Sequence, residues 1–140
     1  MNIFNSKMSL KDFAIAVATE LKEHGIDVIL TGGAVVSIYS ENKYVSNDAD
    51  FLSTTDHQNI LKATGSIKEN GFTLRLLSPT QCVMDRLAAY YHWNDRQSLE
   101  QALLVAENHP IKLNEVKKWS KNEGETSKFQ EFLDGIKIKK

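Results

Sequence analysis

Two adjacent glycines after a short apolar run constrain the fold of this chain more than any other feature. The run Val28-Ile29-Leu30 is rich in β-branched residues, which predicts a short buried strand. Gly32 and Gly33 follow, and two consecutive glycines let the backbone turn sharply and approach a ligand closely. A helix starting at about Ala34 would direct unpaired N–H groups and its positive dipole end at the turn. The segment therefore predicts a strand, a tight turn and a helix start, with a place for a phosphate.

Two aspartates follow this turn with the spacing of neighbours on one face of a strand. Asp48 and Asp50 are separated by one residue, so alternation along a strand puts both carboxylates on the same side. Ala49 and Phe51 then face the other way. Ser37, one turn into the expected helix, would add a hydroxyl beside the glycines. Two carboxylates placed together suit Mg²⁺, so we expect a metal at the aspartates and a phosphate at the turn.

The glycine turn with its serine, followed by the paired aspartates, resembles the signature of the nucleotidyltransferase superfamily that includes DNA polymerase beta. The resemblance covers residues 26 to 53 and is closest to minimal bacterial members found in toxin–antitoxin and abortive-infection systems. It implies that the glycines and Ser37 hold a nucleoside triphosphate. It also implies that Asp48 and Asp50 bind Mg²⁺ and are the catalytic carboxylates. The expected reaction is transfer of a nucleotidyl group to an RNA end or to a protein hydroxyl.

The sequence departs from this family at the third carboxylate, which usually stands on a later strand. The next strand-like run, residues 72–77, offers Arg75 and no acid. The acids between the aspartate pair and that run are Asp56 and Glu69. Both lie in or beside a helix that we expect over residues 56–70.

Two metal ions need more ligands than Asp48 and Asp50 alone supply. A neighbouring subunit of a homo-oligomer could provide the missing group. A non-catalytic alternative is a degenerate domain of the same fold that binds a nucleotide, an RNA or a protein partner. The sequence therefore leaves open whether the protein is an enzyme.

The pattern of elements predicts an α/β (α+β) fold in which a small nucleotidyltransferase-like sheet is flanked by helices and followed by a C-terminal helical bundle. We expect residues 1–77 to form the α/β core and residues 78–140 to form helices packed on it in a single compact unit. The elements expected in the first half are a helix from Leu10 to Gly25, strand 26–30, a helix from Ala34 to about Ser40, the aspartate strand, helix 56–70 and strand 72–77.

The second half is expected to be helical almost throughout. Ser78 can cap a helix, Pro79 fits its first turn and Gln81 can close a capping box. Apolar residues then recur at helical spacing. The side chains expected to be largely buried are Leu87, Tyr91, Leu99, Leu103 and Trp119.

A second group of residues with possible chemistry lies in the segment 85–96. Arg86 and Arg96 could bind phosphate oxygens, as basic residues from the helical part do in related nucleotidyltransferases. The aromatic side chains that could stack on a base are Tyr90, Tyr91 and Trp93. In the alternative interpretation, Tyr91 and Trp93 pack the two halves together and the charged residues form local ion pairs.

The pair formed by Arg86 and His92 also resembles the arginine–histidine motif of HEPN ribonucleases. In such an enzyme the histidine would act as acid or base and the arginine would stabilise charge on the scissile phosphate. HEPN domains are all-helical, whereas this chain begins with an α/β pattern. We therefore rank this interpretation below the other two.

Composition narrows the remaining possibilities. A hydrophobic content of 41% and a charged content of 25% are typical of a soluble globular protein. The absence of an apolar run near ~20 residues and of a signal-peptide core leads us to expect a cytoplasmic protein with no membrane contact. Cys82 is the one cysteine, so an intrachain disulfide and a cysteine metal cage are excluded. The net charge of −1 argues against a broad electrostatic contact with nucleic acid, although lysines gather between Lys112 and Lys121.

Overall fold

The computed structural model describes residues 9–46, 49–53, 64–69 and 72–139, and this part of the chain has a mixed α/β architecture. The described elements are, in chain order, α1 (Leu10–Glu23), β1 (Val28–Thr31), α2 (Gly33–Tyr39), β2 (Asp50–Ser53), β3 (Thr64–Glu69), β4 (Phe72–Leu77), α4 (Pro79–Trp93), α5 (Arg96–Asn108), α6 (Leu113–Asn122) and α7 (Thr126–Lys139). The fold class predicted from the sequence, a small sheet flanked by helices and followed by a helical region, is confirmed.

The four strands form one mixed sheet with the order β2-β1-β4-β3. β1 pairs with β2 in an antiparallel sense, and Thr31 at the end of β1 lies opposite Asp50 at the start of β2. β1 runs parallel to β4, where Leu30 lies opposite Leu76. β3 and β4 are antiparallel. The pairing of β1 with β2 therefore carries Asp50 to the end of β1 at which the glycine turn begins.

The helix expected over residues 56–70 is wrong in its second half. Thr64–Glu69 is a strand that pairs along its whole length with β4, while residues 56–63 lie outside the described part of the chain. Gly65 within this segment disfavours a helix by about 1 kcal/mol relative to alanine, which fits the observed strand. The run 72–77 is a strand as expected.

Serine side chains cap the starts of α1 and α4, and the helix start predicted at Ser78 is confirmed. The Ser9 hydroxyl accepts a hydrogen bond from the Asp12 N–H at 3.1 Å at the start of α1. The Ser78 hydroxyl accepts one from the Gln81 N–H at 3.2 Å, with Pro79 as the first residue of α4. Each bond satisfies one of the backbone donors that a helix start leaves unpaired.

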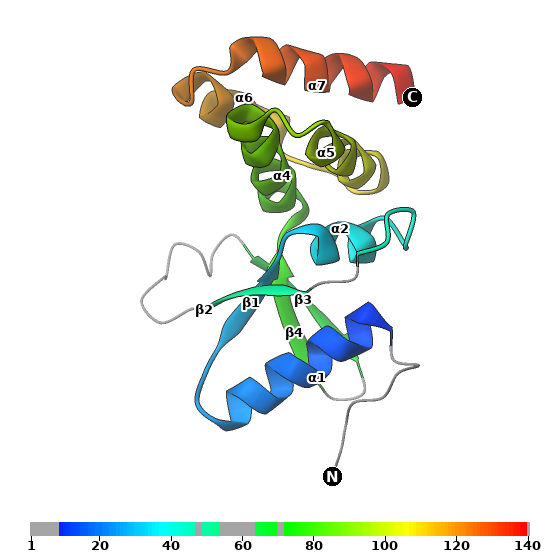
Figure 1. Ribbon diagram of the computed structural model, residues 1–140, viewed down its shortest axis with the longest axis vertical. Helices are drawn as coiled ribbons and strands as arrows, with labels where there is room; N and C mark the ends of the chain where they lie inside the picture. The colour runs from blue at the N-terminus through cyan, green and yellow to red at the C-terminus, as the bar shows by residue number, and fades with distance from the viewer. Residues whose placement is uncertain (1–8, 47–48, 54–63, 70–71, 140) are drawn as a thin grey trace.

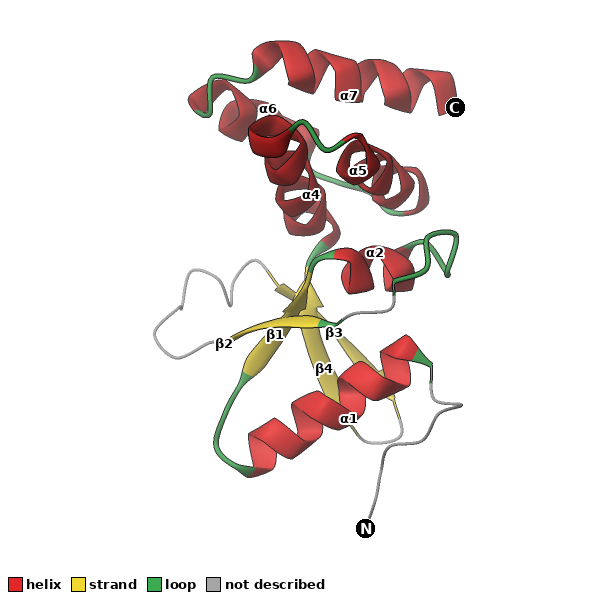
Figure 2. Ribbon diagram, in the orientation of Figure 1, coloured by secondary structure: helices red, strands yellow, loops and turns green. Residues whose placement is uncertain are grey.

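The helices lie in two places relative to the sheet (Figure 1). α1 packs along one face of the sheet against β1 and β4, and α4 to α7 stack beyond one end of it. α2 lies between these two parts, as the red helices and yellow strands of Figure 2 show. It contacts both α4 and α5. Buried apolar side chains from the sheet and from the helical half form one cluster that includes Leu30, Val35, Leu87 and Leu103.

The interior predicted for the helical half is largely confirmed. Leu87, Tyr91, Leu99 and Leu103 are buried. Trp119 is only partly buried, and its ring stacks on Tyr91 with a centroid distance of 5.3 Å. Cys82 is buried in α4, and burial raises the pKa of its thiol.

Across the described segments, no helix has both the length and the apolar character needed to cross a membrane.

Candidate functional site

Gly32 joins β1 to α2 in a backbone conformation that only glycine adopts easily. Its φ is 73° and its ψ is −154°, a region closed to residues with a side chain. A Cβ atom added at Gly32 would lie 3.1 Å from Asp50 Oδ2 and 3.9 Å from Arg86 Nη2. The missing side chain therefore lets a carboxylate from the sheet and a guanidinium from the helical half approach the same point.

Asp50 reaches this point because of the strand pairing. It lies opposite Thr31, whose hydroxyl donates a hydrogen bond to the Asp50 carbonyl oxygen at 3.3 Å. Asp50 is exposed, whereas Ala49 and Phe51 pack partly against the core, as strand alternation predicted. Asp48 lies outside the described residues. The structure thus brings one of the two predicted carboxylates to the glycine turn.

Ser37 supports the turn from inside the protein. Its side chain is buried, and its hydroxyl donates to the Gly33 carbonyl oxygen at 3.3 Å. The Ser37 hydroxyl oxygen in turn accepts a hydrogen bond from the Ser46 N–H at 2.9 Å. Tyr44 and Ser46 lie against Gly33, since a Cβ there would be 3.4 Å from each of their hydroxyl oxygens. Through these hydrogen bonds, Ser37 holds the loop that contains Ser46 against α2.

Arg86 extends from α4 toward the glycine turn and is 19% exposed. Its Nε and Nη2 donate to Asp85 Oδ2 at 3.0 and 2.7 Å, and its Nη1 donates to Gln101 Oε1 of α5 at 3.1 Å. The predicted local ion pair with Asp85 is therefore present, and it holds Arg86 in reach of the site. Of the two arginines proposed for phosphate binding, Arg86 is the one that the structure brings to Gly32.

Arg96 is held elsewhere, in a cluster that joins α4, α5 and α7. It donates to the Tyr90 hydroxyl at 3.2 Å and to Glu131 Oε1 at 2.5 Å, and the Tyr90 hydroxyl donates to Glu131 Oε2. Burial, together with the bond to Glu131, raises the pKa of Tyr90 to about 12. The hydrogen bonds from Tyr90 and Arg96 lower the pKa of Glu131. These contacts make Arg96 part of the helical packing.

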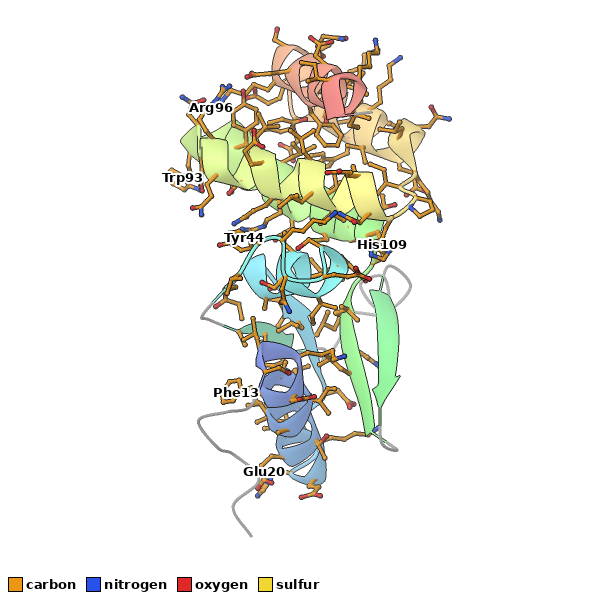
Figure 3. All side chains as sticks on the ribbon, turned by 90° about the vertical axis from the view of Figure 1, so that its right-hand side faces the viewer. Phe13, Glu20, Tyr44, Trp93, Arg96 and His109 are labelled. Carbon is orange, nitrogen blue, oxygen red and sulfur yellow. The ribbon has the colours of Figure 1, made fainter. Side chains whose placement is uncertain are left out.

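The three aromatic residues proposed to stack on a base differ in their exposure. Tyr90 and Tyr91 are buried, and the Tyr91 hydroxyl shares a 2.7 Å hydrogen bond with the Ser120 hydroxyl. Trp93 is 81% exposed and projects from the same edge of the helical half as Arg96 (Figure 3). Trp93 therefore does not pack the two halves together, and it is the member of the three whose ring faces solvent.

Arg86 and His92, the pair that resembles the HEPN motif, engage different elements. Arg86 donates a hydrogen bond to Gln101 of α5, and its Nη2 approaches Gly32. The His92 Nε2 lies 4.0 Å from a carboxylate oxygen of Glu123, which follows α6. The structure therefore does not bring these two side chains to one site.

Within the described residues, the site offers a hard cation such as Mg²⁺ one suitable ligand, the Asp50 carboxylate. Asp50 offers exposed carboxylate oxygens, the ligand type that Mg²⁺ prefers. Within the ranges that the structure describes, no group of three or more histidine, cysteine, aspartate or glutamate side chains could hold a metal ion. Asp48 is outside those ranges, so a metal ion held by Asp48 and Asp50 together stays a prediction.

Residues 10–74 match the model of a family described as "Nucleotidyl transferase of unknown function (DUF2204)". The match runs from α1 into β4 and contains the glycine turn and both aspartates, so the α/β half of the chain is similar to this nucleotidyl transferase family. It ends before α4, which carries Arg86. No curated protein and no solved structure is similar enough to the chain to count as a match.

Sequence reasoning proposed Gly32, Asp50 and Arg86 as site residues, and the structure places these three near one another. It did not propose three residues beside them and Gly33. Tyr44 and Ser46 stand in a polar loop that has no periodic pattern to mark them. Gln101 could have been noticed, because it is three residues after Ser98 and four before Val105, on the buried face of α5. A polar side chain on such a face generally has a specific hydrogen-bond partner.

Proposed function

We propose that this protein binds a nucleoside triphosphate together with Mg²⁺ at the junction between its sheet and its helical half. The observation that supports this most directly is the approach of Asp50 Oδ2 and Arg86 Nη2 to one point beside Gly32. A carboxylate next to a guanidinium at a turn without a side chain suits a magnesium-bound phosphate chain. The similarity of residues 10–74 to a nucleotidyl transferase family supports the same conclusion.

Each residue has a distinct role in this proposal. The backbone of Gly32 and Gly33 faces the phosphates, and Arg86 binds phosphate oxygens through its guanidinium. Asp50, with Asp48, would hold Mg²⁺, which offsets charge on the triphosphate and activates the attacking oxygen. The protein's own contribution would be mainly positioning and charge stabilisation.

We further propose that the protein is a relative of the DNA polymerase beta superfamily, of the bacterial toxin–antitoxin type, that transfers a nucleotidyl group to RNA or to a protein hydroxyl. The glycine turn, the serine and the aspartate pair support this assignment. β4 contributes Arg75 and no carboxylate, so we expect transfer by the isolated chain to be weak or absent. A second copy of the chain could supply the missing ligand.

The test is a transfer assay with each of the four nucleoside triphosphates, labelled on the α-phosphate, in the presence of Mg²⁺. Any transfer should be abolished by Asp48→Asn and by Asp50→Asn, with the melting temperature of each variant unchanged. Asp134→Asn on α7 is the matched control, because Asp134 is exposed and accepts a hydrogen bond from Gln130 of its own helix. Transfer that persists in Asp50→Asn would contradict the assigned role.

The same samples distinguish an enzyme from a non-catalytic nucleotide-binding module. A module would show no transfer, yet a triphosphate with Mg²⁺ would still raise its melting temperature, because it binds the folded state alone. If neither transfer nor stabilisation occurs with any of the four nucleotides, the proposed function is wrong.

A further inference from the structure

We propose that Asp85 and Gln101 are positioning residues that orient the Arg86 guanidinium so that its remaining N–H groups face a phosphate. This inference rests on the proposed function, because it specifies how the phosphate is recognised there. It assigns a role to two residues outside the part of the chain that matches the family model.

The hydrogen bonds of Arg86 leave a defined pair of donors. A guanidinium has five N–H donors, of which Nε carries one and each terminal nitrogen carries two. Asp85 accepts from Nε and Nη2, and Gln101 accepts from Nη1. One N–H on each terminal nitrogen remains, so both terminal nitrogens keep a donor for phosphate oxygens, the groups that a guanidinium binds through charged hydrogen bonds. Nη2 is the nitrogen that approaches Gly32.

Gln101 is buried beside Arg86, and its hydrogen bond to Arg86 offsets the cost of burying its amide. It is 5% exposed on α5, among residues that pack against α4. Burying an amide without a hydrogen bond is costly, and the bond from Arg86 satisfies its carbonyl oxygen. An arginine that is already held loses less conformational entropy when it binds a ligand. The contact therefore preorganises Arg86 before the phosphate arrives.

Asp85 allows a test in which positioning and simple charge predict opposite results. Its carboxylate carries a negative charge close to the proposed phosphate, so its removal should strengthen anion binding if charge alone matters. If Asp85 orients Arg86, its removal should weaken binding. Asp85 is 34% exposed, so Asp85→Ala leaves no buried group unpaired apart from the Arg86 donors themselves.

The first experiment measures binding of inorganic tripolyphosphate with Mg²⁺ to the full chain by titration calorimetry. We expect Asp85→Ala to raise the dissociation constant about tenfold, because the charged hydrogen bonds that hold Arg86 in place before binding are lost. A dissociation constant that is unchanged or lower would overturn the inference.

The second experiment places Gln101→Met in two backgrounds, with Gln97→Met as the matched control on the exposed face of α5. Gln101→Met should weaken tripolyphosphate binding about tenfold in the wild type and have no effect when Arg86→Ala is already present. Gln97→Met should leave binding unchanged. An equal loss in both backgrounds would mean that Gln101 does not act through Arg86. If Gln101→Met fails to fold, Asp85→Ala with and without Arg86→Ala gives the same test.

A parallel titration with non-hydrolysable nucleoside triphosphates separates this inference from the proposed function. Tripolyphosphate binding that depends on Asp85 and Gln101, without binding of any nucleotide, would contradict the function and support the inference. Nucleotide binding that neither variant weakens would support the function and overturn the inference. A wild-type protein that binds neither probe would overturn both.

Discussion

At Gly32, the absence of a side chain determines how closely two oppositely charged groups can approach one point. The backbone there has a positive φ, and the space that a Cβ would fill lies near both the Asp50 carboxylate and the Arg86 guanidinium. The positive φ disfavours a side chain at Gly32 through the backbone, and the nearby Asp50 and Arg86 leave little space for one. A substitution at Gly32 should therefore affect stability and ligand binding together.

We predict that Gly32→Ala lowers the free energy of unfolding by about 1–3 kcal/mol, the usual cost of a side chain in this backbone region. It should also abolish the stabilisation by a triphosphate with Mg²⁺, because the new methyl group displaces Asp50. Urea unfolding and melting temperature with and without ligand measure the two effects.

Gly25→Ala is the control for this prediction. Gly25 also has a positive φ, of 78°, but a Cβ there would meet nothing within 4 Å. It should lose stability and keep the ligand effect. If Gly32→Ala behaves in the same way, the site is not at Gly32.

The cluster around Tyr90 leads to a prediction about alkaline pH. The pKa of Tyr90 is raised to about 12 in the folded protein, so the folded state holds its phenolic proton at pH values where the unfolded chain releases it. The resulting stabilisation is complete below the ordinary tyrosine pKa of about 10 and is lost as the pH rises through about 12. Tyr91, whose pKa burial also raises, contributes in the same direction.

Tyr90→Phe should therefore make the free energy of unfolding fall less steeply between about pH 10 and 12. At neutral pH it should lower stability by about 1 kcal/mol, since the hydrogen bond to Glu131 is lost. Denaturant unfolding over this pH range measures both quantities. An identical slope in wild type and variant would show that Tyr90 does not titrate as described.

At the scale of elements, the sequence correctly predicted helices that have strong local signals. It failed for β3, whose conformation depends on hydrogen bonding to a neighbouring strand. Ser78, which caps α4, and the apolar spacing within the helices are local features. They located α1 and α4 correctly. β3 has no such signal: Thr64-Gly65-Ser66 is neither apolar nor alternating. Its strand conformation depends on hydrogen bonds to β4, which tertiary context supplies. Gln101 illustrates the same limit, because its partner comes from another helix.

The contact of α5 with α7 leads to a prediction about packing. Gly135 of α7 lies against Leu103 of α5, and a Cβ at Gly135 would be 2.8 Å from Leu103 Cδ2. Leu103→Ala should cost about 2–5 kcal/mol, because Leu103 is buried. Gly135→Ala should destabilise the wild type through overpacking, but stabilise the Leu103→Ala variant by up to about 1 kcal/mol, since alanine favours helix more than glycine does.

A double-mutant cycle by urea unfolding measures this coupling between Leu103 and Gly135. Strictly additive effects of the two substitutions would mean that the two helices do not meet at these residues.

At the scale of the whole molecule, the candidate site lies where the two halves meet. The family match ends at residue 74, yet Arg86, Asp85 and Gln101 belong to the helical half beyond it. Another hydrogen bond holds the same junction: His109 Nε2, directly after α5, donates to the carbonyl oxygen of Tyr39 in α2 at 2.9 Å. The helical half therefore contributes directly to the site as well as to the core. The sequence suggested Arg86 as a phosphate ligand, but its position beside Gly32 depends on packing between segments distant in the chain.

The most direct test of this account is a crystal structure of the protein with a non-hydrolysable nucleoside triphosphate and Mg²⁺. We predict that the triphosphate lies beside Gly32, with a phosphate within hydrogen-bond distance of Arg86 and the metal ion bound by Asp50. A triphosphate bound at another surface, with Asp50 and Arg86 making no contact to it, would contradict the account.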